Sequence, residues 1–141
     1  QAPCVTIDAL GNVTRNEEDE LGRETKRIDP LGNVTETQYD LLGRRAAVRD
    51  PGGNLTTFGY DEMGRLATVT DALLNVTSYG YDARGNRVSV TDANLKTTTF
   101  GYDLANRLIR ETTPIGTVTE FGYDAAGNRT QKRDGKNQVT T

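Results

Sequence analysis

Tyr60-Asp61-Glu62-Met63-Gly64-Arg65 is the stretch that decides the fold, because the chain repeats its pattern at a fixed interval. The same 21-residue step recurs at Tyr39-Asp40, Tyr81-Asp82, Tyr102-Asp103 and Tyr123-Asp124, and Glu18-Asp19 is a degenerate sixth copy. A fixed period of this length indicates a tandem-repeat array, in which each unit contacts mainly its neighbours. We expect a single array over residues 1–141, of six to seven repeats, that is a fragment of a longer repeat region.

A second turn recurs between the Tyr-Asp copies. It begins at Asp8, Asp29, Asp50 and Asp71 and ends four residues later in Asn, and it decays from Asp92 onward. Both turns share the pattern Asp, two free positions, Gly, which is typical of a type I turn closed by a residue with positive φ. The predicted turn residues are Asp40, Gly43, Asp61, Gly64, Asp82, Gly85, Asp103, Asn106, Asp124 and Gly127, together with Asp29, Gly32, Asp50 and Gly53 of the second turn. Asn106 replaces a glycine, and Asn tolerates positive φ well.

The segments between the turns read as β-strands. Residues 44–49, 54–60, 65–70 and 75–81 are rich in Val, Thr, Tyr and Phe,. Strands joined by turns this short are antiparallel neighbours, because a parallel crossover needs a dozen residues or more. The sequence therefore predicts an all-β fold, an antiparallel β-hairpin repeat array with two strands per repeat that forms a twisted, curled strip or spiral.

The odd period requires one extra residue in each repeat, since otherwise every side chain would change face from copy to copy. We assign it to the turn at residues 50–54, as a longer loop or a bulge. This register gathers the aromatic residues in two columns, at Tyr39, Phe58, Tyr60, Tyr79, Tyr81, Phe100, Tyr102, Phe121 and Tyr123. It sets Tyr39, Tyr81 and Tyr123 beside Arg45, Arg87 and Arg129, and Tyr60 and Tyr102 beside Leu66 and Leu108. We expect the opposite face to carry Ala46, Val48, Leu55, Ala67, Val69, Val76, Val88 and Val90, with Gly59, Gly80, Gly101 and Gly122.

Composition excludes several classes of function. The net charge of −3 comes from interleaved charges of both signs, whereas a nucleic-acid binder shows a basic stripe,. No run of about 18 apolar residues exists, so we expect no membrane insertion, and residues 1–10 carry no signal peptide. Cys4 is the only cysteine and histidine is absent, which excludes an internal disulfide, zinc binding and Cys-His catalysis,. The redox state and role of Cys4 stay open.

The repeat resembles that of the Rhs, or YD-repeat, family. The resemblance rests on two patterns: Tyr-Asp-x-x-Gly-Arg, and the Asp-x-x-Gly-Asn turn after the strand that follows it. The resemblance covers residues 8 to about 137. It implies a curled β-strip that spirals into a hollow shell, which in bacterial members encloses a toxic C-terminal segment. Related repeats occur in teneurins and insecticidal toxin complexes, so the resemblance implies a secreted or cell-surface location. Asp29-Pro30-Leu31-Gly32 looks like part of the family's self-cleavage motif, but it matches its neighbours as a repeat turn.

The recurring acidic residues do not form a convincing catalytic or metal site. A catalytic group rarely needs five identical copies, and a glycosidase needs two carboxylates in different environments. Calcium-binding β-helix turns repeat every nine residues and supply about six oxygens, which the spacing here does not reproduce. Five Asn-x-Thr sequons, at Asn12, Asn33, Asn54, Asn75 and Asn128, are explained by an Asn that ends a turn and a Thr that begins a strand,. We therefore expect no enzymatic activity, cofactor or metal.

Three roles remain, and the first is the leading hypothesis. In it, the chain is a structural segment of a β-strip shell or scaffold that encloses or presents another polypeptide, such as a C-terminal toxin, with neighbouring repeats as its other partners. The second role is an extracellular adhesive module that recognises glycans or a protein through its aromatic face. The third is self-assembly into a β-fibre through exposed edge strands.

Overall fold

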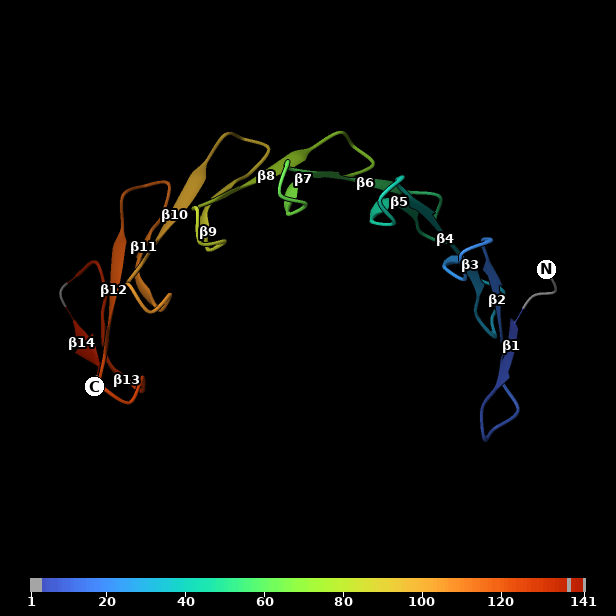
Figure 1. Cartoon of the computed structure of the whole chain (residues 1–141), viewed down its shortest axis with the longest axis horizontal. Helices are drawn as coiled ribbons and strands as arrows, with labels where there is room; N and C mark the ends of the chain where they lie inside the picture. The colour runs from blue at the N-terminus through green and yellow to red at the C-terminus, as the bar shows by residue number, and fades with distance from the viewer. Residues whose placement is uncertain (1–3, 137, 141) are drawn as a thin grey trace. The chain divides into compact units, whose positions relative to one another are not determined.

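The computed structural model describes residues 4–136 and 138–140. These residues form 14 β-strands and no helix. The chain divides into two compact units, residues 1–75 and residues 76–141. Within each unit, consecutive strands lie side by side in chain order (Figure 1). None of the described residues belongs to a helix long and apolar enough to cross a membrane.

The N-terminal unit contains seven strands. They are β1 (Cys4–Ile7), β2 (Val13–Glu18), β3 (Glu24–Ile28), β4 (Val34–Tyr39), β5 (Arg45–Arg49), β6 (Leu55–Tyr60) and β7 (Leu66–Thr70). Each strand pairs antiparallel with the next. A short Asp-led turn joins every pair, so one 21-residue repeat supplies two strands, as the sequence predicts.

The C-terminal unit continues the same pattern. Its strands are β8 (Val76–Tyr81), β9 (Arg87–Thr91), β10 (Thr97–Tyr102), β11 (Leu108–Thr112), β12 (Val118–Tyr123), β13 (Arg129–Arg133) and β14 (Val139–Thr140). Each again pairs antiparallel with the next. The predicted all-β antiparallel hairpin array is confirmed in both units.

The extra residue of each repeat is a β-bulge after the Tyr-Asp turn. In the hairpin of β6 and β7, Gly59 lies opposite Thr68 but Tyr60 lies opposite Leu66, so Ala67 has no partner across the ladder. The same shift occurs at every other Tyr-Asp hairpin within the two units. Assignment of the extra residue to residues 50–54 is therefore wrong. Both turns carry the same Asp-x-x-Gly pattern and close loops of the same size, so the odd residue is accommodated in a strand.

The bulge also changes which aliphatic residues share the aromatic face. Residues directly opposite each other in an antiparallel pair point to the same side. Phe58 pairs with Val69, Tyr79 with Val90 and Thr37 with Val48, so these three valines lie on the aromatic face. Their predicted place on the opposite face is wrong, because the bulge advances the alternation of the second strand by one residue. Ala46, Ala67 and Val88 are the bulge residues themselves.

Leu55 and Val76 do lie on the face of the strand glycines, as predicted, and polar side chains surround those glycines. A Cβ atom at Gly59 would collide with the Thr68 hydroxyl, and one at Gly80 with the Ser89 hydroxyl. Elsewhere this glycine face carries ion pairs across strands, such as Lys26 Nζ to Glu17 at 3.3 Å. The absent Cβ thus makes room for a neighbour on the next strand.

Little of the described chain is shielded from solvent. Ala47, on the glycine face of β5, is the only buried hydrophobic residue among those described, at 6 % exposed. A single layer of sheet leaves both faces accessible, so hydrophobic burial contributes less to stability than it does in a two-layer domain. Backbone ladders, turns and contacts between repeats must therefore hold the array together.

Candidate functional site: the Tyr-Asp turn ladder

Each Tyr-Asp turn is organised by its aspartate. In the turn after β6, the Gly64 N–H donates to the Asp61 carbonyl at 2.9 Å, and the Asp61 N–H donates to the Arg65 carbonyl at 2.9 Å. Asp61 Oδ1 accepts the N–H groups of Met63 and Arg65 at 3.0 and 2.9 Å. Gly64 has φ of 79°, a left-handed conformation that costs glycine little,. The side chain of Asp61 therefore satisfies backbone donors that the turn leaves free.

All the predicted turn residues occupy equivalent positions. The closing residues have positive φ: 81° at Gly43, 89° at Gly85, 61° at Asn106, 88° at Gly127, 84° at Gly32 and 83° at Gly53. Each donates its N–H to the backbone carbonyl of the aspartate three residues earlier, namely Asp40, Asp82, Asp103, Asp124, Asp29 and Asp50. Two leucines, Leu74 and Leu95, also close turns with positive φ, of 64° and 59°. The sequence predicts the turn that begins at Asp71 but not the positive φ of Leu74 and Leu95, because leucine rarely adopts this conformation.

The second carboxylate oxygen of the turn aspartate, Oδ2, binds the side chain of the residue that follows the turn. In the Tyr-Asp turns where an arginine follows, it accepts a charge-assisted hydrogen bond from Arg Nε, at 2.7 Å for Asp40 and Arg44 and 2.8 Å for Asp61 and Arg65. Asp103 holds Arg107 in the same way at 2.7 Å. In the turns at Asp82 and Asp124, Nδ2 of Asn86 and Asn128 takes this place at 3.0 Å. In the turn at residues 50–54, Asn54 Nδ2 takes this place at 2.9 Å. The aspartate therefore fixes the direction in which the arginine extends.

That direction carries the arginine over a tyrosine of the next repeat. The Arg44 guanidinium lies 4.3 Å from the centre of the Tyr60 ring, and Arg23 lies 4.6 Å from that of Tyr39. Arg107 lies 4.9 Å from the Tyr123 ring. Cation–π contacts at exposed sites contribute about 0.5 to 1 kcal/mol each.

The tyrosine hydroxyl completes the connection between repeats. Tyr60 Oη donates to the Arg45 carbonyl at 2.8 Å, and Tyr123 Oη donates to the Leu108 carbonyl at 2.8 Å. Tyr39 and Tyr102 make the same bond to the carbonyl 15 residues earlier. Pairing between β5 and β6 ends at Ala47, so the Arg45 carbonyl has no ladder partner from β6. The hydroxyl supplies the missing donor.

We call this set of aspartate, arginine and tyrosine contacts the Tyr-Asp ladder. The register places Tyr39 opposite Arg45 and Tyr60 opposite Leu66, as the sequence predicts. The predicted neighbours of Tyr81, Tyr102 and Tyr123 are also found, at Arg87, Leu108 and Arg129. The arginines opposite tyrosines cover the other aromatic column instead, where Arg45, Arg87 and Arg129 lie 5.6 to 5.8 Å from Phe58, Tyr79, Phe100 and Phe121. Sequence reasoning missed the inter-repeat stacking, which the recurring 16-residue spacing from turn arginine to tyrosine could have indicated.

The ladder coincides with the repeat unit of a known family. The protein-family model described as RHS Repeat matches residues 19–55, 42–74, 75–97, 81–114 and 102–139. The chain belongs to the RHS repeat family. Comparison with curated protein sequences gives no match.

Solved structures with a similar fold belong to much longer chains. The Photorhabdus luminescens Tc holotoxin pore, with a mutation in TccC3, matches 87% of this chain at 17% identity and a TM-score of 0.59, over 9% of its own chain. The TcdB2-TccC3 crystal structure matches 89% at 18% identity and a TM-score of 0.58, over 10% of its chain. The same complex without its hypervariable C-terminal region matches 90% at 19% identity and a TM-score of 0.54, over 9%. The RHS chain thus spans about a tenth of these proteins.

Ten of the RHS turn aspartates have lowered pKa values. Hydrogen bonds from the Asn12 side chain and backbone hold the pKa of Asp8 below its ordinary value of 3.8. At Asp61 the backbone N–H of Arg65 has the largest effect, and partial desolvation opposes it without cancelling the lowered pKa. The pKa of Asp124 is lowered mainly by the Asn128 side chain. These carboxyl groups are stabilised as anions, which suits turn acceptors rather than proton donors.

Further contacts join successive RHS turns in the C-terminal unit. Asn86 Nδ2 donates to Asn106 Oδ1 at 2.8 Å, and Arg107 Nη1 donates to the Asp124 carbonyl at 3.2 Å. Because the carboxylates already bind their own turns, they are not free to converge. No group of three His, Cys, Asp or Glu side chains within residues 4–136 and 138–140 could hold a metal ion. The arrangement can connect one repeat to the next, and this is the role that its geometry supports.

Proposed function

We propose that the chain is a wall segment of a shell that encloses another polypeptide, without enzymatic activity of its own. The Tyr-Asp ladder is the observation that supports this role best. Tyr60 binds the backbone and the turn arginine of the repeat before it, so each repeat extends a continuous sheet. A continuous single-layer sheet can separate a compartment from solvent without requiring an interior core.

The comparisons support the shell role at the level of family and fold. The chain belongs to the RHS repeats, and solved structures of similar fold include Tc toxin complexes that contain TccC3. We infer an extracellular, toxin-delivery setting for this chain from those neighbours. A single array, its curl into a spiral and a C-terminal toxin as the enclosed partner are parts of the same proposal.

The glycan-binding alternative has no specific support. Tyr39, Tyr60 and Tyr123 already have an arginine over the ring and a hydroxyl bonded to backbone. Stacking on a sugar requires a free ring face. The ring faces and hydroxyl groups that a glycan-binding surface would need are thus already engaged in the Tyr-Asp ladder.

Limited proteolysis of the full-length gene product that carries this chain tests the proposal. We expect the segment after the repeats to resist a protease that digests the same segment when it is expressed alone. The double variant Tyr60→Ala, Tyr123→Ala removes two rungs of the ladder and should expose the segment. Equal cleavage of the segment in the full-length product and in isolation would contradict enclosure.

A further inference from the structure

One of the two aromatic columns is incomplete in the N-terminal unit. Its members recur every 21 residues, at Phe58, Tyr79, Phe100 and Phe121. The same step places Thr37, on β4, one repeat before Phe58. Thr37 lies opposite Val48, and Phe58 likewise lies opposite a valine, so the two positions are equivalent. A threonine thus occupies a position at which the later repeats carry a ring.

Arg87 shows how a complete stretch of this column is built. It lies on β9, between the strands that carry Tyr79 and Phe100. Its guanidinium lies 5.8 Å from the centre of the Tyr79 ring and 5.6 Å from that of the Phe100 ring. Both distances are within the range of cation–π contacts. One arginine is therefore in contact with two rings.

Arg45 is the equivalent arginine in the N-terminal unit, two repeats earlier. Its guanidinium lies 5.8 Å from the centre of the Phe58 ring on β6. On its other side, β4 offers Thr37, which has no ring. Among the described residues, one side of Arg45 therefore lacks the aromatic contact that Arg87 has.

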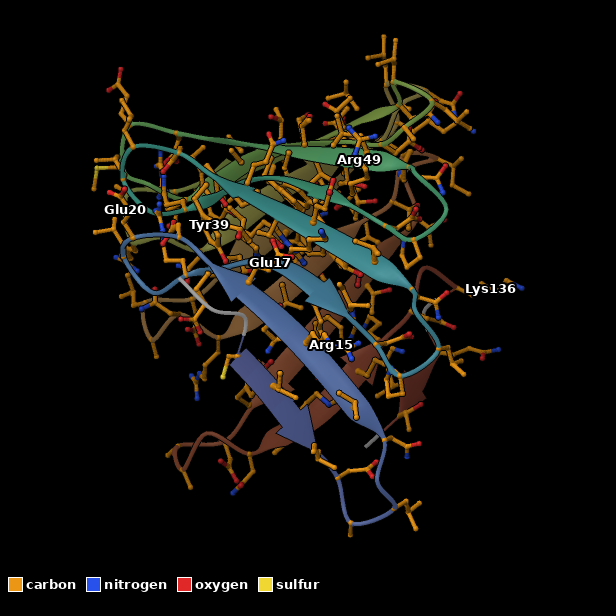
Figure 2. All side chains as sticks on the ribbon, turned by 90° about the vertical axis from the view of Figure 1, so that its right-hand side faces the viewer. Arg15, Glu17, Glu20, Tyr39, Arg49 and Lys136 are labelled. Atoms are coloured by element: carbon orange, nitrogen blue, oxygen red, sulfur yellow. The ribbon has the colours of Figure 1, made fainter. Side chains whose placement is uncertain are left out.

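A pocket of about 470 Å³ lies at the position of the missing ring, lined in part by Thr37, Arg45 and Val48. Figure 2 shows the two ends of this stretch of sheet, with Tyr39 toward the Tyr-Asp turns and Arg49 toward the second turns. The pocket extends from Arg45, which is opposite Tyr39, toward the turn that follows Arg49. Its volume is that of a small-ligand site, which is about 300 to 1,000 Å³.

The charges of the pocket balance, so they do not select an ion. Arg27 and Arg45 contribute two guanidinium groups, and Glu24 and Asp29 contribute two carboxylates. The Asp29 carboxylate also accepts hydrogen bonds from the backbone of its own turn. An uncharged aromatic ring fits this lining, because the face of a ring attracts a guanidinium such as that of Arg45.

Other polar groups of the pocket suit a ring that a polypeptide carries. Arg27 and Thr35 lie opposite each other on β3 and β4, and both line the pocket. A guanidinium donates to peptide carbonyls, and a hydroxyl can bond to either peptide group. An aromatic side chain together with its flanking peptide groups can therefore use both parts of the pocket.

We propose that this pocket binds a phenylalanine or tyrosine side chain of a second polypeptide, with the ring stacked on Arg45 and the flanking peptide groups bonded to Arg27 and Thr35. The bound ring takes the place beside Arg45 that Tyr79 holds beside Arg87. The site is a property of the folded strip and does not depend on enclosure.

Nuclear magnetic resonance of the whole chain tests the site, with N-acetylphenylalaninamide as the probe. We expect the methyl signals of Thr37 and Val48 to shift and to saturate with a Kd of about 10 mM, the affinity that one buried ring can provide. N-acetylcyclohexylalaninamide has a similar shape without the π system and should bind about two- to fivefold more weakly. Benzyl alcohol carries the ring without peptide groups and should also bind more weakly.

Each probe has an outcome that contradicts one part of the proposal. The absence of a saturable shift up to about 50 mM N-acetylphenylalaninamide would overturn the site itself. Equal affinity for the saturated analogue would overturn stacking on Arg45. Equal affinity for benzyl alcohol would overturn the polypeptide as the source of the ring.

Replacement of the stacking arginine gives an independent measurement. Arg45→Leu introduces the side chain that the chain already carries at the equivalent Leu66, so the variant should fold. We expect it to weaken binding of N-acetylphenylalaninamide about two- to fivefold. Arg87→Leu is the matched control, because both rings beside Arg87 belong to the chain, and it should leave binding unchanged. Equal effects of the two variants would overturn the role of Arg45.

Filling the pocket from within the chain needs no probe. Thr37→Phe supplies the ring that the column lacks, so it should raise the melting temperature and abolish binding of N-acetylphenylalaninamide. Thr37→Val keeps the size of threonine and should leave binding unchanged. A lower melting temperature for Thr37→Phe would show that the pocket does not accept a ring and would overturn the proposal. None of these outcomes bears on enclosure, which protease protection measures separately.

Discussion

The Asp-x-x-Gly turn is the residue-scale unit of this RHS chain, because one carboxylate and one left-handed residue shape most of its hairpins. Asp61 accepts two backbone N–H groups and holds Arg65, and Gly64 closes the loop. The exposed side chains between Asp61 and Gly64 contribute little to the stability of the hairpin. Substitutions at neighbouring positions of one turn should therefore differ widely in effect.

Gly64→Val should destabilise the hairpin far more than Glu62→Val. Gly64 has φ of 79°, where a β-branched residue costs at least about 1 to 2 kcal/mol,. Glu62 is exposed, and its change should stay within about 0.5 kcal/mol,. Urea unfolding followed by circular dichroism measures both. Equal tolerance of the two variants would contradict the turn assignment.

Acid should destabilise the fold through the turn aspartates. The pKa of Asp61 is lower in the folded chain than its ordinary value of 3.8, so the carboxylate stabilises the fold fully above that value,. This contribution is lost as pH falls through the lower folded pKa. We expect melting temperatures to hold between pH 7 and 5 and to fall below about pH 4.

Asp61→Asn is the control for the acid prediction. It should be less stable than the parent chain at pH 7, and the difference should shrink as pH falls below the folded pKa of Asp61. A constant difference from pH 7 to pH 2 would show that the Asp61 charge contributes nothing.

At the scale of elements, the two strands of a repeat were predictable and the connections between repeats were not. Turn patterns set the strand order, and the constant place of Tyr60 and its equivalents set the register across the Tyr-Asp hairpin. The bulge at Ala67 was misplaced, because an odd period shows that an extra residue exists but not which strand holds it. Stacking of Arg44 on Tyr60 was missed, because it depends on the direction that Asp40 gives to the arginine.

Tyr102→Phe should weaken the connection between two repeats in the C-terminal unit. It removes the hydrogen bond from Tyr102 Oη to the Arg87 carbonyl, of length 3.0 Å, and keeps the ring. The expected loss is about 0.5 to 1.5 kcal/mol in urea unfolding. Tyr79→Phe is the matched control, since the Tyr79 hydroxyl makes no hydrogen bond within the described chain. Equal losses in the two variants would argue against the hydroxyl contact.

At the scale of the whole molecule, a chain held by contacts between neighbours should tolerate the loss of a whole repeat. Deletion of residues 44–64 joins Gly43 to Arg65 and recreates an Asp-x-x-Gly-Arg turn. We expect the shortened chain to fold, with a urea m-value reduced by about one-seventh, because m scales with the surface exposed on unfolding.

Deletion of residues 45–64, one residue fewer, is the control for the repeat deletion. It leaves an odd residue that shifts the strand register and turns side chains to the wrong face. Circular dichroism should show a folded chain for the first deletion and loss of cooperative unfolding for the second. Comparable unfolding of both would contradict a register set by the 21-residue period.

The contacts of Tyr60 imply an order in which the repeats can fold during synthesis. Its partners, Arg44 and the Arg45 carbonyl, both precede it in the chain. The ribosome therefore synthesises Arg44 and Arg45 before it synthesises Tyr60, which binds them. Each repeat can settle onto the finished one before it while the rest of the chain is still being translated, so a long wall of such repeats need not wait for its last residue to begin folding.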